Sequence, residues 1–301
     1  MTDAISPASR LAGCLGAARA PFLVLPVALV ANGAAAQAWA GTFSWPRTLL
    51  ALLGLVAMHV AVNALNEASD FESGIDLVTR RTPFSGGSGA IPGHLITTRS
   101  ARQLGWSALL VGVLVGGWFL ARDGTALLPL LLVGLLLVTG YSTTFARMGL
   151  GEVAAGLGLG LLPVLGTAIA QGAPASDAAW AAPFPAFFLT FDLLLLNEFP
   201  DEAADRAGRR KNLVLMLGRR PAARLYLLAA LAVPAAIAFG VGLGAMPRSC
   251  LLGLVPSLLL AGPGRWALAE PEQPVPVRAL AANVLWNLAT NALLAVGFLL
   301  G

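Results

Sequence analysis

Charge is the property this sequence has least of. Only 11% of its 301 residues are Asp, Glu, Lys or Arg, whereas an ordinary soluble domain has roughly 25%. The mean hydropathy is +0.78 and 57% of the residues are apolar. These values exclude a water-soluble domain of this length. They also exclude disorder, because disordered chains combine low hydrophobicity with high charge.

Cysteine and histidine are also scarce, with two of each. Cys14 and Cys250 form neither a disulfide framework nor a metal-binding spacing, and two histidines exclude a His-rich metal site. The net charge of +4 and the pI of about 9.8 would suggest nucleic acid in a soluble protein. In a membrane protein such residues set the orientation in the bilayer, so we expect a lipid bilayer and no nucleic acid as partner.

Nine apolar windows follow one another, each near the ~20 residues that a helix needs to cross a bilayer. They lie at 20–38, 48–66, 102–121, 125–142, 153–171, 181–197, 222–244, 249–266 and 280–300. The first window imitates a signal peptide, but the many windows after it favour a retained span. We therefore predict one all-α domain over residues 1–301, a polytopic bundle of nine transmembrane helices.

The basic residues alternate between the two sides of this arrangement. With the N-terminus in the cytoplasm, 16 of the 19 Lys and Arg residues fall on cytoplasmic segments and span ends. Only Arg47, Arg122 and Arg248 fall outside. A missed or extra span in the middle would destroy this bias. We expect a multi-pass protein of the cell inner (plasma) membrane with a cytoplasmic N-terminus.

A first acidic cluster lies where the second window meets a cytoplasmic loop. Four polar residues there, spaced by four, three and four positions, share one face of the predicted helix: His59, Asn63, Asn66 and Asp70. Gly74 would break the helix and let Asp76 fold back toward Asp70. Such oxygen ligands suit Mg²⁺, which commonly bridges one or two carboxylates to substrate phosphates. The alternative is a solvated loop cap.

A second acidic cluster follows the sixth window. Three polar residues share a helical face at intervals of four: Asn197, Asp201 and Asp205. Like charges at this spacing repel one another, so we expect a divalent cation between them. Lys211 and the arginines at 206, 209 and 210 follow at once and could bind phosphate oxygens. The alternative is an amphipathic loop helix of mixed charge.

Together the two clusters predict one metal and diphosphate site. Facing each other across a bundle, they would hold two or three Mg²⁺ ions that neutralise a departing diphosphate. The apolar interior would take a long hydrocarbon chain. The candidate metal ligands are Asn66, Asp70, Asp76, Asn197, Asp201 and Asp205. The four aspartates among them are also the candidate catalytic residues.

Nine polar residues are candidates for binding the substrates: Asn63, Asn66, Arg80, Arg81, Tyr141, Arg147, Asp192, Asn197 and Lys211. Asp192 lies inside a span, where a carboxylate is costly; it either lines the cavity or has an internal partner. His59 either packs as a hydrogen-bonded group or lines the acceptor cavity. Arg147 either contacts diphosphate or acts as a positive-inside anchor. The segment 80–89 is either a flexible connector or a lid whose glycine N–H groups bind phosphate.

Three asparagines recur at intervals of four on the last window, and we expect them to pack between helices: Asn283, Asn287 and Asn291.

The paired motifs resemble the two signatures of the UbiA superfamily of intramembrane prenyltransferases, which also has nine transmembrane helices. Segments 70–76, 149–152, 162–167 and 197–211 are similar to the menaquinone branch, typified by 1,4-dihydroxy-2-naphthoate prenyltransferase. Many branch members have Asp where this chain has Glu67. The resemblance implies Mg²⁺-dependent transfer of a polyprenyl group from an allylic diphosphate to an aromatic quinone precursor, with metals binding the diphosphate at both motifs.

Two alternatives remain at this point. The acceptor could instead be 4-hydroxybenzoate, a tetrapyrrole, a chlorin or a glycerol phosphate lipid. The protein could also be an ion or organic-anion transporter, although transporter sites usually lie near the bilayer midplane at broken helices. Here both clusters lie at one membrane edge beside arginines, which favours an enzyme with a cytoplasmic mouth. Acceptor identity, prenyl chain length and oligomeric state stay open.

Overall fold

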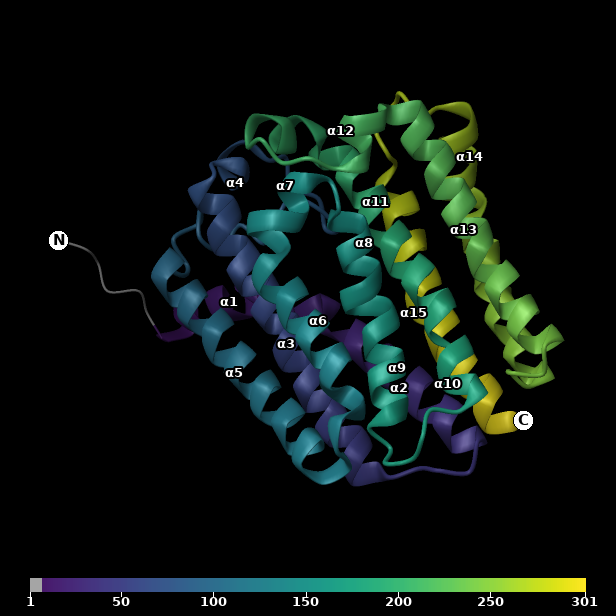
Figure 1. The fold of residues 1–301 in the computed structure, drawn as a ribbon. Coiled ribbons are helices and arrows are strands. Elements are labelled where there is room, and N and C mark those ends of the chain that lie inside the picture. Colours follow the sequence, from purple (N-terminus) through teal and green to yellow (C-terminus); the bar gives the residue numbers. More distant parts are fainter. Residues whose placement is uncertain (1–6) are drawn as a thin grey trace.

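The computed structural model describes residues 7–301, and every regular element in that range is a helix (Figure 1). Nine helical segments of this range are long and apolar enough to cross a membrane, which confirms the predicted number. Four are single helices: α3 (Trp45–Glu72), α5 (Thr98–Asp123), α13 (Arg219–Gly242) and α15 (Val277–Leu300). The protein is thus an all-α membrane bundle.

The other five spans are built from shorter helices in series. They are η1 with α2 (Ala20–Leu23, Val24–Trp39), η2 with α6, η3 and α7 (Thr125–Leu127, Leu128–Gly140, Tyr141–Phe145, Ala146–Met148), α8 with η4 and α9 (Gly151–Gly156, Leu157–Leu161, Leu162–Ile169), α10 with α11 (Asp177–Ala181, Pro183–Ala207), and η5 with α14 (Arg248–Leu260, Ala261–Ala269). Both η3 and η4 are π-helical, and such turns are frequent at functional sites.

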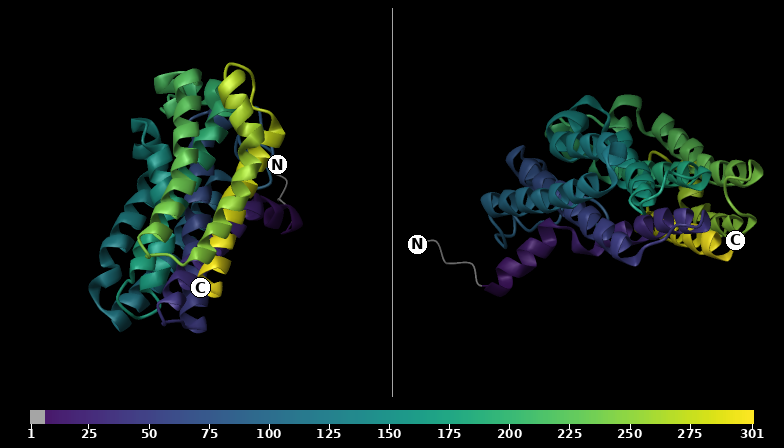
Figure 2. Two further views of the ribbon diagram at one scale, coloured as in Figure 1. Left: turned by 90° about the vertical axis from the view of Figure 1, so that its right-hand side faces the viewer. Right: turned by 60° about the horizontal axis from the view of Figure 1, so that its bottom comes forward.

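Three short helices lie outside the spans: α1 (Pro7–Ala17), α4 (Ile75–Val78) and α12 (Leu213–Leu217). The views in Figure 2 show α1 beside the bundle rather than within it. The short helices α4, α7 and α12 gather at the end where α3 and α11 finish (Figure 1). We call this the motif end, because both acidic motifs lie there.

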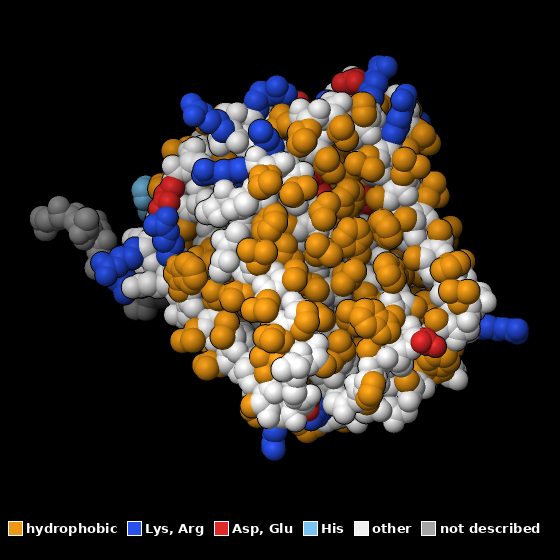
Figure 3. All heavy atoms as spheres, in the orientation of Figure 1, with side chains coloured by type: hydrophobic (Ala, Val, Ile, Leu, Met, Phe, Trp, Pro, Cys, Tyr) orange, Lys and Arg blue, Asp and Glu red, His pale blue; other side chains and the backbone are white. Residues whose placement is uncertain are grey.

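The main apolar core joins α2, α9, α11, α13, η5 and α15. Its fully buried members include Leu29, Val164, Leu189, Val233, Ile237 and Trp286. A Cβ atom on Gly33 would lie 2.2 Å from the Val164 carbonyl oxygen, so α2 and α9 pack backbone against backbone. Apolar side chains also cover most of the outer face in Figure 3, and charged ones gather at its edges. This distribution fits a surface exposed to lipid.

Hydrogen bonds between helices cross the interior and confirm the expected role of the asparagines on the last span. The amide of Asn291 accepts from Asn32 at 3.0 Å, and Asn287 donates to the Thr190 hydroxyl at 3.4 Å. The Tyr226 hydroxyl donates to Asn283 at 3.0 Å. Such bonds contribute only about 0.6 kcal/mol each in membrane proteins, so they define the register of the helices more than the stability.

Candidate active site

The first motif folds as its spacing predicts. Helix α3 ends at Glu72, and Gly74 takes the left-handed conformation with φ 82°. Glycine adopts this conformation without a steric penalty. The chain therefore reverses into α4, which returns Asp76 to the pocket that Asn66 and Asp70 line.

The second motif lies on an unbroken face of α11. The helix continues through Pro200 to Ala207, so its three motif residues point into the same pocket. This polar pocket has a volume of about 80 Å³. Its lining includes all six predicted metal ligands: Asn66, Asp70, Asp76, Asn197, Asp201 and Asp205. The structure thus brings the two motifs together at the motif end.

A glycine-rich loop ties the two motifs to each other. The Gly86 N–H donates to Asp201 Oδ2 at 3.2 Å, and the Ser88 N–H donates to Glu67 Oε2 at 3.1 Å. Gly87 has φ +72°, and a Cβ atom there would lie 2.6 Å from Asp76 Oδ1. The loop therefore approaches the carboxylates so closely that only glycine fits. This geometry argues against a flexible connector, and it directs the Gly86 and Ser88 N–H groups to carboxylates.

Arg210 supplies positive charge between the motif helices. Its guanidinium lies 2.5 Å from Asp70 Oδ1 and 3.8 Å from Asp205 Oδ1. Burial alone would lower the pKa of Arg210, but the neighbouring carboxylates of Asp70 and Asp205 outweigh it and raise the pKa above its ordinary value. The guanidinium therefore stays charged and offsets part of the acidic charge of the pocket.

Negative charge still exceeds positive charge around the pocket. Burial, reinforced by the charges of Glu67 and Asp70, raises the pKa of Asp76 to about 7. Within residues 7–301, three motif oxygens have no hydrogen-bond partner: Asp76 Oδ2, Asn197 Oδ1 and Asp201 Oδ1. Buried polar oxygens without partners are costly. Cations bound together with a substrate phosphate would supply partners for such oxygens.

The ligand set fits Mg²⁺ that arrives with a phosphate. Across residues 7–301, no three Asp, Glu, His or Cys side chains converge as a cage for one ion, and the Arg210 guanidinium already contacts Asp70 and Asp205. Mg²⁺ keeps several waters and is usually held by one or two carboxylates together with substrate phosphates. The oxygens of the predicted metal ligands therefore suit Mg²⁺ bound together with a diphosphate better than Mg²⁺ bound by protein groups alone.

Arg19 is a site residue that sequence reasoning missed. It lies between α1 and η1 in the left-handed region, with φ 50° and ψ 52°, which non-glycine residues rarely adopt. Its side chain lines the polar pocket and the larger pocket beside it. In the part of the chain that the structure describes, its Nε has no partner. In the sequence, a basic residue just before the first apolar window predicts only an orientation signal.

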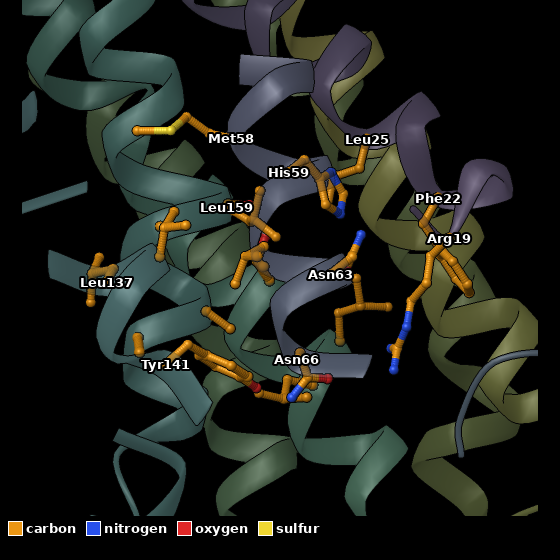
Figure 4. A pocket seen from close by; sticks show the side chains of 18 of the residues that line it. Arg19, Phe22, Leu25, Met58, His59, Asn63, Asn66, Leu137, Tyr141 and Leu159 are labelled. Atoms are coloured by element: carbon orange, nitrogen blue, oxygen red, sulfur yellow. The ribbon is translucent and has the colours of Figure 1, made fainter. Parts of the chain in front are cut away.

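The larger pocket extends from the polar one into the bundle. It has a volume of about 180 Å³. The two pockets share six lining residues: Arg19, Asn66, Phe84, Tyr141, Leu194 and Asn197. Figure 4 shows Asn66 and Tyr141 at one end, Met58 at the other, and His59 and Asn63 between them. The Nδ1 atom of His59 has no partner among the described residues. His59 therefore lines the cavity, as one of its two interpretations proposed.

Four predicted substrate-binding residues line neither pocket, and their binding roles stay predictions. Arg80 and Arg147 are exposed, and Arg81 donates to the Asp76 carbonyl at 2.7 Å, which closes the loop. Asp192 is buried on α11; its backbone carbonyl accepts from Asn283, and its two carboxylate oxygens have no hydrogen-bond partner among the described residues. Lys211 does line the polar pocket.

Comparisons with known proteins agree with this geometry. A model of the UbiA prenyltransferase family matches residues 24–299. The chain is 30% identical to a 1,4-dihydroxy-2-naphthoate octaprenyltransferase of Mycobacterium tuberculosis, covering 93% of this chain and 96% of that protein. A protein of the same name from Bacillus subtilis is 27% identical over 59% of this chain and 57% of its own length.

Solved structures share the fold. A UbiA homolog from Archaeoglobus fulgidus bound to GPP and Mg²⁺ aligns with a TM-score of 0.67 at 15% identity, covering 95% of this chain and 98% of that one. A digeranylgeranylglyceryl phosphate synthase aligns with a TM-score of 0.66 at 13% identity, covering 97% and 98%. The chain therefore belongs to the UbiA prenyltransferase family and is a multi-pass membrane prenyltransferase.

Proposed function

We propose that this enzyme transfers a polyprenyl group from an allylic diphosphate to 1,4-dihydroxy-2-naphthoate, with Mg²⁺ bound at the two acidic motifs. The observation that carries the proposal is the junction of the two pockets. The polar pocket holds carboxylates and Arg210, and it joins a mostly apolar cavity at Arg19, Asn66, Tyr141 and Asn197. The names of the curated relatives support the naphthoate acceptor.

Each pocket suits one part of the reaction. Bound Mg²⁺ would be held by the six motif residues and would neutralise charge on the departing diphosphate. Arg19 and Arg210 bind phosphate oxygens through charge-assisted hydrogen bonds. The lid at Gly86 and Gly87 covers the pocket and restricts water. The apolar cavity holds the prenyl chain, so that an electron-rich ring carbon, rather than water, attacks the allylic carbon. The new C–C bond replaces the allylic C–O bond, whose electron pair leaves with the diphosphate, and the attacked ring carbon then loses its proton, or CO₂ where it carries the carboxylate.

The acceptor lies between the polar and apolar regions. Asn63 lines the cavity about one helical turn inward from Asn66 on α3, and His59 lines it about two turns inward. Asn63 already donates to the Ala18 carbonyl at 3.2 Å, which leaves its carbonyl oxygen for a ring hydroxyl. An aromatic acceptor held by these two side chains presents its ring to the end of the donor next to the diphosphate.

The orientation in the membrane is also part of the proposal. The basic residues at the motif end support a cytoplasmic mouth and N-terminus in the cell inner membrane. A single domain over residues 1–301 is part of the same proposal. The apolar core that joins helices from both halves of the chain supports this assignment.

The acceptor and the metal are tested in one assay. Purified enzyme in detergent receives Mg²⁺, allylic diphosphates of several lengths and a panel of acceptors: 1,4-dihydroxy-2-naphthoate, 4-hydroxybenzoate, a chlorin and a glycerol phosphate lipid. Mass spectrometry should detect a prenylated product with the naphthoate alone, and EDTA should abolish it. A product with another acceptor would overturn the naphthoate assignment. Folded protein that releases no pyrophosphate would contradict the whole proposal.

A further inference from the structure

A second apolar chamber lies beyond the larger pocket. It has a volume of about 160 Å³ and is lined by α3, α5, α6 and the span that contains α9. The two cavities adjoin at four shared lining residues, which we call the neck: Leu55, Met58, Val138 and Gly158. The polar pocket, the larger pocket and the second chamber therefore lie side by side in series.

Helix α3 runs along this whole series. Asn66 and Asp70 line the polar pocket, and Leu55 lies at the neck. Ala51 lines the second chamber. From position 66 to position 51 the helix rises roughly 22 Å at ~1.5 Å per residue. The lining is thus polar at the motif end and apolar farther along α3. A long prenyl diphosphate has the same order, with a charged diphosphate at one end and a hydrocarbon chain behind it.

We propose that the second chamber binds the distal units of a long prenyl chain, and that Gly134 and Gly166 keep the chamber open for them. The inference rests on the proposed function, because the chain must begin at a diphosphate held by the two motifs. It assigns a separate path between α3, α5, α6 and α9 to the far end of the donor.

The space around these two glycines supports the assignment. A Cβ atom on Gly134 would have nothing within 4 Å, and one on Gly166 would contact only Leu130 Cδ2 at 3.7 Å. By contrast, a Cβ atom on Gly112, which also lines the chamber, would lie 2.7 Å from Met58 Sδ, so the Met58 side chain would have to move to admit it. Packing does not require glycine at 134 or 166. A side chain at either position would instead occupy the chamber.

The position of α6 gives the chain a way out to lipid. The span that contains α6 is the least buried of the nine, with 11% of its most apolar window inside the protein. Helices α5, α6 and α9 lie on the same face of the bundle in Figure 1. A prenyl chain too long for the chamber can therefore continue between these helices into the bilayer. Its end then stays in an apolar environment and is not exposed to water.

The test compares a long and a short donor in Gly134→Leu and Gly166→Leu enzymes. With octaprenyl diphosphate, kcat/KM should fall about tenfold or more, since even one methylene in an apolar pocket changes it by about 10- to 200-fold. With geranyl diphosphate, it should change little, because the short chain ends before the chamber. Gly117→Leu is the matched control, since Gly117 is exposed on α5 and lines neither pocket.

The outcomes separate this inference from the proposed function. Parent enzyme that transfers neither donor contradicts the proposed function. If the parent enzyme transfers both donors, the test is the ratio of kcat/KM for octaprenyl diphosphate to that for geranyl diphosphate. An unchanged ratio in both Leu variants contradicts the role of the second chamber and leaves the proposed function intact. An equal loss with both donors also contradicts that role. If a Leu variant does not fold, Gly134→Ala and Gly166→Ala replace it; Ala favours a helix more than Gly, and a smaller shift of the same sign is expected.

Discussion

Asp201→Asn enzyme should lose prenyl transfer by on the order of 10³-fold, yet be at least as heat-stable as the parent. The activity falls because a charged ligand aimed at the metal–diphosphate complex is removed, and losing one group of this kind typically costs about 10²- to 10³-fold. The stability holds because Asp201 lies in a cluster of carboxylates and its Oδ1 has no partner among residues 7–301. Removing its charge relieves repulsion from Asp205.

Asp70→Asn enzyme should lose as much activity but also lose stability. The Asp70 carboxylate is the 2.5 Å partner of the buried Arg210 guanidinium. Breaking a buried pair by removing one partner costs about 3 kcal/mol or more. The two variants should therefore move the melting temperature in opposite directions while their pyrophosphate release falls together.

A carboxylate far from the motifs provides the control for both variants. Asp177 is exposed at the start of α10, and Asp177→Asn should change neither turnover nor melting temperature appreciably. Pyrophosphate release and thermal unfolding in detergent give the two readouts. Near-full activity in both motif variants would refute the assignment of the two motifs to the metal site.

Helical periodicity explains why much of the site was predictable. The intervals between Asn66 and Asp70, and between Asn197, Asp201 and Asp205, place each set on one helical face. The structure adds only that the two faces meet. The return of Asp76 was predictable because Gly74 is the kind of residue that lets a chain reverse. The nine spans were predictable because an apolar window of ~20 residues has few alternatives.

Loop residues and long-range contacts were not predictable in this way. Arg80, Arg81 and Arg147 lie outside helices or at their ends, where sequence spacing gives no direction for a side chain. Glu67 was known only as a departure from the family pattern, and its contact with Ser88 depends on how the loop folds back. The position of Asp192 could have been inferred, because five residues at 3.6 per turn place it roughly 140° from Asn197.

Arg19 is the residue for which the structure changes the interpretation most, and its removal should be the most informative single change. In Arg19→Gly enzyme, kcat/KM for the prenyl diphosphate should fall by about 10- to 100-fold, since hydrogen bonds to charged groups contribute about 1.5–3 kcal/mol. Glycine suits the left-handed backbone at this position, where φ is 50°. Folding should therefore be unaffected, and the loss reports the guanidinium alone.

Steady-state kinetics with varied prenyl diphosphate concentration show whether Arg19 binds the substrate or only orients the first span in the membrane. A phosphate contact predicts a raised KM, with Arg19→Lys recovering part of the loss, because lysine keeps the charge but not the forked geometry. Arg10→Ala is the matched control: Arg10 precedes the same span but is exposed on α1. If Arg19→Gly and Arg10→Ala enzymes both keep the parent kcat/KM, Arg19 serves only to orient the first span. A loss confined to Arg19→Gly instead places the beginning of the first span in the diphosphate site, beside the two acidic motifs.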